Sequence, residues 1–160
     1  MLRVGLIDVD GHNGYPNLPL MKLSAWHKQR GDSVEWYKPL VSGHMDIVYL
    51  SKVFGFTPDY LYPIDADEII KGGSGYCIEV VDGKEVYHSE RDRMLPDEIE
   101  HIYPDYGLYP KKTRDTAYGY LTRGCPMGCD FCIIKDKEGR KSHKVAELSE
   151  FFKGGGTKEH

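Results

Sequence analysis

Short apolar runs separated by polar turns dominate the first half of the chain. Residues 3–9 form an apolar, β-branched run of the kind that is buried in a parallel sheet. A mostly apolar helical pattern follows between Asn17, a candidate N-cap with Pro19 in the first turn, and Gly31. Further short strands are predicted at residues 33–37, 46–50 and 67–73. This order of elements predicts an open, doubly wound α/β sheet.

The carboxyl ends of the predicted strands are the expected place for a ligand. In a Rossmann-like open sheet, ligands bind beyond these ends. The loops predicted to form this rim are residues 8–17, 40–44, 51–56 and 72–76. The glycine-rich run 72–75 lacks the Lys-Ser/Thr pair of a P-loop and the G-x-G-x-x-G spacing, so it predicts a tight turn rather than a nucleotide site.

The second half of the chain changes character. A small β insertion is predicted around the Asp82-Gly83 turn, and one helical turn is predicted at residues 96–101. Residues 102–115 are rich in Tyr, Pro and Gly and predict a linker whose tyrosines pack onto its neighbours. Residues 116–122 alternate like a strand, and residues 145–152 carry apolar side chains at helical spacing. The expected organisation is an α/β domain at 1–101, the linker at 102–115, and a strand-loop-helix unit within 116–160.

Composition limits the classes of protein to consider. The chain has 160 residues, 40% of them hydrophobic, and a net charge of -4. This composition predicts a globular protein without general affinity for nucleic acid. The sequence has neither a secretory signal pattern nor an apolar stretch of about 18 residues, so membrane insertion is not expected. Cysteines kept reduced for metal binding would place the protein in the cytoplasm.

The candidate chemistry lies in the C-x3-C-x2-C run of Cys125, Cys129 and Cys132. Three thiolates can hold three irons of a 4Fe-4S cluster and leave the fourth iron open, whereas a structural cluster has four cysteine ligands. The alternative is a zinc site with a fourth ligand from Cys77, His143 or His160. Zinc ribbons normally pair two knuckles, and a second C-x2-C is missing from this chain. Cys77 lies in a predicted strand and is expected to be a buried apolar residue.

The cysteine run resembles the signature of the radical S-adenosylmethionine family, which has an aromatic residue, here Phe131, before the last cysteine. The resemblance implies that Cys125, Cys129 and Cys132 ligate a 4Fe-4S cluster. It also implies that S-adenosylmethionine chelates the open iron, that Phe131 lies near the adenine, and that cleavage gives methionine and a 5′-deoxyadenosyl radical. An electron donor such as flavodoxin or ferredoxin would then be a partner.

The layout before the cysteines is similar to the cobalamin-binding-like domain of one branch of that family. The D-x-H-x-x-G motif of this branch is matched imperfectly by residues 10–14, because the glycine arrives one residue early. His12 is also easily explained as a surface or loop residue bonded to Asp8 or Asp10, so cobalamin stays an alternative and His12 is not counted as a ligand.

A complete barrel of the TIM type needs roughly 200 residues or more. The sequence is therefore expected to be the N-terminal part of a radical S-adenosylmethionine enzyme, with only the start of its barrel, a frayed tail at 154–160 and no activity alone. Its substrate is not readable from these residues. The apolar side chains of 145–152 would be exposed and would favour self-association. The competing interpretation is a non-catalytic module that binds zinc, a closed iron-sulfur cluster or a protein partner.

Overall fold

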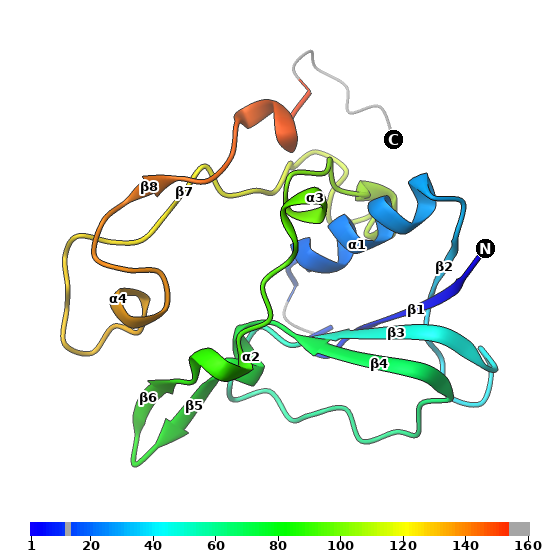
Figure 1. Ribbon diagram of the computed structural model, residues 1–160, viewed down its shortest axis with the longest axis horizontal. Coiled ribbons are helices and arrows are strands. Elements are labelled where there is room, and N and C mark those ends of the chain that lie inside the picture. Colours follow the sequence, from blue (N-terminus) through cyan, green and yellow to red (C-terminus); the bar gives the residue numbers. More distant parts are fainter. Residues whose placement is uncertain (12–13, 154–160) are drawn as a thin grey trace.

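The computed structural model describes residues 1–11 and 14–153 (Figure 1). Its centre is a four-stranded parallel sheet in the order β2-β1-β3-β4. The strands are β1 (Arg3–Asp8), β2 (Ser33–Trp36), β3 (Met45–Ser51) and β4 (Ala66–Gly72). This sheet confirms the predicted α/β class and the Rossmann-like open arrangement.

One face of the sheet is covered by α1 (Leu18–Gln29). The helix begins as predicted, because the Asn17 side chain accepts a hydrogen bond from the Leu20 amide at 3.2 Å. Its apolar side then packs against the sheet. The fully or almost fully buried cluster on this face comprises Val4, Leu6, Leu20, Leu23 and Ile99. Burial of this stripe fixes α1 across β1.

On the opposite face, no helix among residues 1–11 and 14–153 forms the second layer of a doubly wound sheet. The buried cluster on this face comprises Ile7, Tyr37, Met45, Val48 and Leu50. Within the described residues, Tyr37 belongs to this cluster, and Tyr60 and Ile64 of the irregular connection 52–65 pack against it. The parallel order of the strands agrees with the prediction, whereas the second helical layer of a doubly wound sheet is not seen in the described part of the chain. Prolines in the connections 37–44 and 52–65, among them Pro39, disfavour a helix there.

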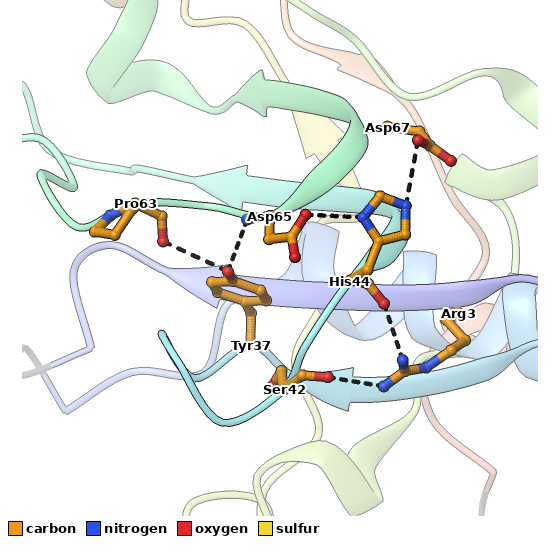
Figure 2. A network of polar contacts seen from close by, with 7 residues as sticks. All are labelled: Arg3, Tyr37, Ser42, His44, Pro63, Asp65 and Asp67. Carbon is orange, nitrogen blue, oxygen red and sulfur yellow. Dashed lines mark hydrogen bonds and ion pairs between the residues drawn. The ribbon is translucent and has the colours of Figure 1, made fainter.

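Residues 40–44 lie at the amino ends of the strands rather than on the predicted rim. Figure 2 shows Arg3 at the start of β1 donating to the carbonyls of His44 (2.9 Å) and Ser42 (2.8 Å). The His44 ring then faces Asp65 through Nδ1 (2.8 Å) and Asp67 through Nε2 (3.2 Å). The prediction fails for this loop because the chain must return from the carboxyl end of β2 to the amino end of the parallel strand β3.

The His44 contacts predict a pH-dependent contribution to stability. Hydrogen bonds first to Asp65 and then to Asp67 raise the pKa of His44 above its ordinary value of 6.5. The stabilisation is therefore fully present below about pH 6.5 and is lost as the pH rises through the higher pKa of the folded state. We expect the free energy of unfolding of wild type, minus that of His44→Gln, to fall as the pH rises above about 6.5.

Urea denaturation at a series of pH values measures this difference. His101, whose pKa is raised by the hydrogen bond to Glu150, titrates in the same direction. Its contribution is common to both proteins and cancels in the difference. A difference that stays constant with pH would show that the two carboxylates do not act on His44.

The insertion after the sheet contains the predicted hairpin. Helical turn α2 (Ser74–Cys77) precedes β5 (Ile78–Val81) and β6 (Lys84–Tyr87), which pair antiparallel. Asp82 and Gly83 both have positive φ angles, as a two-residue hairpin turn requires. Cys77 is fully buried as expected, although it ends α2 instead of beginning a strand. The short helices η1 (Ser89–Arg91) and α3 (Asp97–Glu100) follow.

The segment 102–115 is fixed to the sheet and to α1. It contains one short turn, η2 (Tyr106–Leu108). Asp105 Oδ2 accepts hydrogen bonds from Ser24 Oγ and Lys28 Nζ of α1, each at 2.6 Å. Tyr109 donates through its hydroxyl to Asp8 Oδ2 at 2.6 Å and packs edge-on against Trp36. Tyrosines therefore attach this segment, as the sequence predicted.

The remaining chain extends from the sheet as an arm, residues 116–153 (Figure 1). Its elements are β7 (Thr122–Arg123), α4 (Ile134–Lys137), β8 (His143–Lys144) and η3 (Leu148–Glu150), with β7 and β8 antiparallel. Of the predicted strand at 116–122 only Thr122 lies in a strand, and the predicted helix at 145–152 is reduced to η3. Residues 116–120 have no strand beside them in the described part of the chain, and Leu148 and Phe152 stay partly exposed because no described surface covers them.

Candidate functional site

The cysteine loop starts from a backbone conformation that requires glycine. Gly124, directly after β7, has φ +83°, and a Cβ at this position would overlap the carbonyl oxygen of Lys141. The Cys125 amide donates to the Gly139 carbonyl at 3.2 Å. The loop is thereby held at its base, where its two ends meet beside β7 and β8.

Glu138 is a residue of this site that sequence reasoning missed. Its Oε1 accepts from Arg123 Nη1 at 3.0 Å, and its Oε2 accepts from the Gly124 amide at 3.1 Å. One carboxylate therefore joins the two ends of the cysteine loop. In the sequence it is a single acidic residue within a run of charges, which carries no specific signal.

The three thiols belong to one short loop without converging. Cys125, Cys129 and Cys132 are free and partly buried, and the Cys132 amide donates to the Cys129 carbonyl at 3.1 Å. Among residues 1–11 and 14–153, the structure brings no group of three His, Cys, Asp or Glu side chains together in a way that could hold a metal. Phe131 is 89% exposed. Three thiols are suitable ligands for an iron-sulfur cluster. The loop would have to bring their sulfur atoms together to hold one.

Among the described residues, neither Cys77 nor His143 joins the three thiols in a group that could hold a metal. The Cys77 thiol donates to the Ser74 carbonyl at 3.6 Å, and burial raises the pKa of this thiol. His143 Nδ1 faces the Lys141 carbonyl at 3.3 Å. His12 and His160 lie outside the described residues. The contacts of Cys77 and His143 therefore give no support to either residue as the fourth ligand of a zinc site.

A cavity of about 1100 Å³ opens at the carboxyl end of the sheet. Three of the four predicted rim loops contribute to its walls through Asp8, Ser51 and Gly72 at the ends of β1, β3 and β4. Leu20 and Leu23 of α1 add apolar surface. The cavity therefore lies where ligands bind in open α/β sheets, beyond the carboxyl ends of the strands. The part of its wall that comes from the arm was not predicted.

Polar groups on the sheet side of the cavity are mutually bonded. Asn17 Nδ2 donates to Ser51 Oγ at 2.9 Å. Burial raises the pKa of Asp8, although the hydrogen bond from Tyr109 opposes this shift. Nearby, the buried Asp10 carboxylate accepts from Thr57 Oγ1 at 2.5 Å and from the Val53 amide. These bonds fix the shape of the carboxyl edge of the sheet.

The cavity extends to the base of the cysteine loop. Tyr118, Tyr120 and Arg123 form part of its wall, and Arg123 is two positions before Cys125. Lys137 of α4 also lines the cavity, and its Nζ lies 3.7 Å from Asp92 Oδ2 of the insertion. A ligand in this cavity would therefore contact both the sheet and the arm that carries the three thiols.

Comparisons of the chain with models of known protein families, with curated proteins and with solved structures give no significant match. None of the helices in residues 1–11 and 14–153 combines the length and apolar character needed to span a bilayer.

Proposed function

We propose that Cys125, Cys129 and Cys132 bind a 4Fe-4S cluster that cleaves S-adenosylmethionine reductively. The observation that supports this proposal is the position of the C-x3-C-x2-C loop, whose base forms part of the wall of a large ligand-sized cavity. Three thiolates leave one iron open for the amino and carboxylate groups of S-adenosylmethionine. When bound and reduced, the cluster supplies the electron that breaks a carbon–sulfur bond, giving methionine and a 5′-deoxyadenosyl radical.

The chain's own residues have separate roles in this proposal. Glu138 holds the ends of the loop together through Arg123 and the Gly124 amide. Phe131 projects into solvent from the loop and is available to contact the adenine. The cavity beside Arg123 accommodates the molecule on which the radical acts. Cobalamin bound at the sheet edge is a variant of this proposal that rests on domain layout alone.

Anaerobic reconstitution with iron and sulfide tests the proposal on the full chain. We expect about four iron and four sulfide per chain, with an electron paramagnetic resonance signal after reduction that changes when S-adenosylmethionine is added. Formation of 5′-deoxyadenosine with a reductant such as flavodoxin would establish cleavage. Addition of hydroxocobalamin to the same material, followed by gel filtration and absorbance, tests whether a corrinoid is retained.

Two results would contradict the proposal in different ways. A protein that retains one tightly bound zinc and takes up no sulfide would be a zinc module. If the cluster is complete but its electron paramagnetic resonance signal does not change on addition of S-adenosylmethionine, the protein has a closed iron-sulfur site used for electron transfer or structure.

A further inference from the structure

The outer edge of β4 is unpaired within the described part of the chain. β4 ends the sheet order and pairs with β3 alone (Figure 1). Its side chains at Asp67, Ile69 and Lys71 are 70%, 45% and 46% exposed. Free strand edges present unpaired amide and carbonyl groups that can bind another strand.

The hydrogen-bond pattern shows which backbone groups face outward. The Lys52 amide donates to the Gly72 carbonyl at 3.0 Å, so the backbone of Gly72 faces β3. Backbone groups alternate between the two sides of a strand. Asp67, Ile69 and Lys71 therefore direct their amide and carbonyl groups away from β3. Across residues 1–11 and 14–153, these outward groups have no hydrogen-bond partner.

We propose that β4 binds β4 of a second copy of this chain in antiparallel orientation, with the two-fold axis at Ile69. This register places Ile69 opposite the same residue of the second copy. It also places each Asp67 opposite Lys71 of the other strand, so that two pairs of opposite charges form. The two four-stranded sheets then become one continuous sheet through the dimer.

Charge selects this register over its neighbours. Axes at Asp67, Glu68 or Lys71 would place a charged residue opposite its own copy, which is destabilising. An axis at Ile70 would leave Asp67 and Lys71 without opposite charges. Among these registers, the axis at Ile69 satisfies both conditions: outward-facing backbone groups lie opposite each other, and each Asp67 lies opposite a Lys71.

The contacts that Asp67 and Lys71 make within one chain are compatible with this pairing. Asp67 lies 3.2 Å from His44 Nε2, and Lys71 lies 2.8 Å from Asp59. Both pairs are exposed to solvent, and such pairs are weak. Charges on an edge strand commonly prevent association, but they do so by repulsion, whereas the arrangement here is self-complementary.

Charge exchange tests the register. Sedimentation equilibrium should show an 18.3 kDa chain converting to a species of twice that mass as the concentration rises. Asp67→Lys and Lys71→Asp should each weaken the dimer roughly tenfold by creating like-charge pairs. The double variant Asp67→Lys/Lys71→Asp should restore most of the wild-type affinity. A monomer at every concentration, or single variants that dimerise like wild type, would overturn the proposal.

Cross-linking tests the position of the axis independently. Cα atoms of directly paired residues in an antiparallel hydrogen-bonded pair are about 5.5 Å apart, within the reach of a disulfide. Ile69→Cys should therefore give a covalent dimer under mild oxidation. Val80→Cys, at a 56% exposed position of β5, is the control for random collisions and for bonds made by the native cysteines. Equal dimer yields from the two variants would contradict the pairing of β4, with far-UV circular dichroism confirming that both are folded.

Discussion

Replacement of Cys125, Cys129 or Cys132 by alanine is expected to reduce the iron and sulfide of the reconstituted protein to near background. Each thiolate holds one iron of the proposed cluster, and a cluster with only two protein ligands is readily lost. Iron and sulfide analysis together with the absorbance near 400 nm, roughly where cysteine-ligated clusters absorb, measures the loss. This is the largest effect that we expect on cluster binding.

Cys77→Ala is the matched control, because the structure places this fourth cysteine in α2 and buries it. Its substitution removes a thiol from the chain without touching the cysteine loop. We expect iron and sulfide per chain to stay close to the wild-type value. Loss of the cluster in Cys77→Ala, together with retention in Cys129→Ala, would mean that the ligand assignment is wrong.

Gly73→Ala is expected to destabilise the fold by about 3 kcal/mol or more. Gly73 follows β4 with φ +100°, a conformation that alanine adopts only with strain. An added Cβ would also overlap the carbonyl oxygen of Lys52, directly after β3. The Lys52 carbonyl accepts a hydrogen bond from the Gly75 amide at 2.8 Å. The backbone of Lys52 therefore cannot move away from an added Cβ without breaking this buried hydrogen bond. Urea denaturation followed by circular dichroism measures the change in the free energy of unfolding.

Gly83→Ala separates backbone strain from the overlap between an added Cβ and a neighbouring carbonyl. Gly83 also has a positive φ, +76°, but nothing lies within 4 Å of the position that a Cβ would take in this hairpin turn. We expect a loss of about 1 kcal/mol there, from backbone strain alone. If both variants lose the same amount, the close approach of Lys52 to Gly73 does not contribute to stability.

The parallel strands and α1 could be predicted because their signals are local. An apolar run such as residues 3–9 identifies a buried strand, and Asn17 with Gly31 marks the ends of the helix. The hairpin was equally clear, since Asp82-Gly83 suits the positive φ angles of its turn. The rim of the sheet then followed from topology, apart from the loop at residues 40–44.

The arm could not be predicted from its pattern. Residues 116–122 alternate and residues 145–152 have helical spacing, yet neither becomes the expected regular element. Periodicity indicates which face of an element would be buried, but burial itself depends on a second surface. Individual contacts hold the arm instead of a regular element. The Tyr106 hydroxyl, for example, donates to the Phe151 carbonyl at 2.6 Å and attaches the end of the arm.

Local residue patterns were enough to specify the four parallel strands, the capped helix and the presence of three thiols in one glycine-containing loop, because each depends on neighbouring residues. Three further features came from packing: the irregular connection 52–65 packs against one face of the sheet, Glu138 closes the base of the cysteine loop, and Arg123 lines the cavity at the sheet edge. These features join residues that are distant in the chain or chemically ordinary, so no local pattern could have revealed their roles.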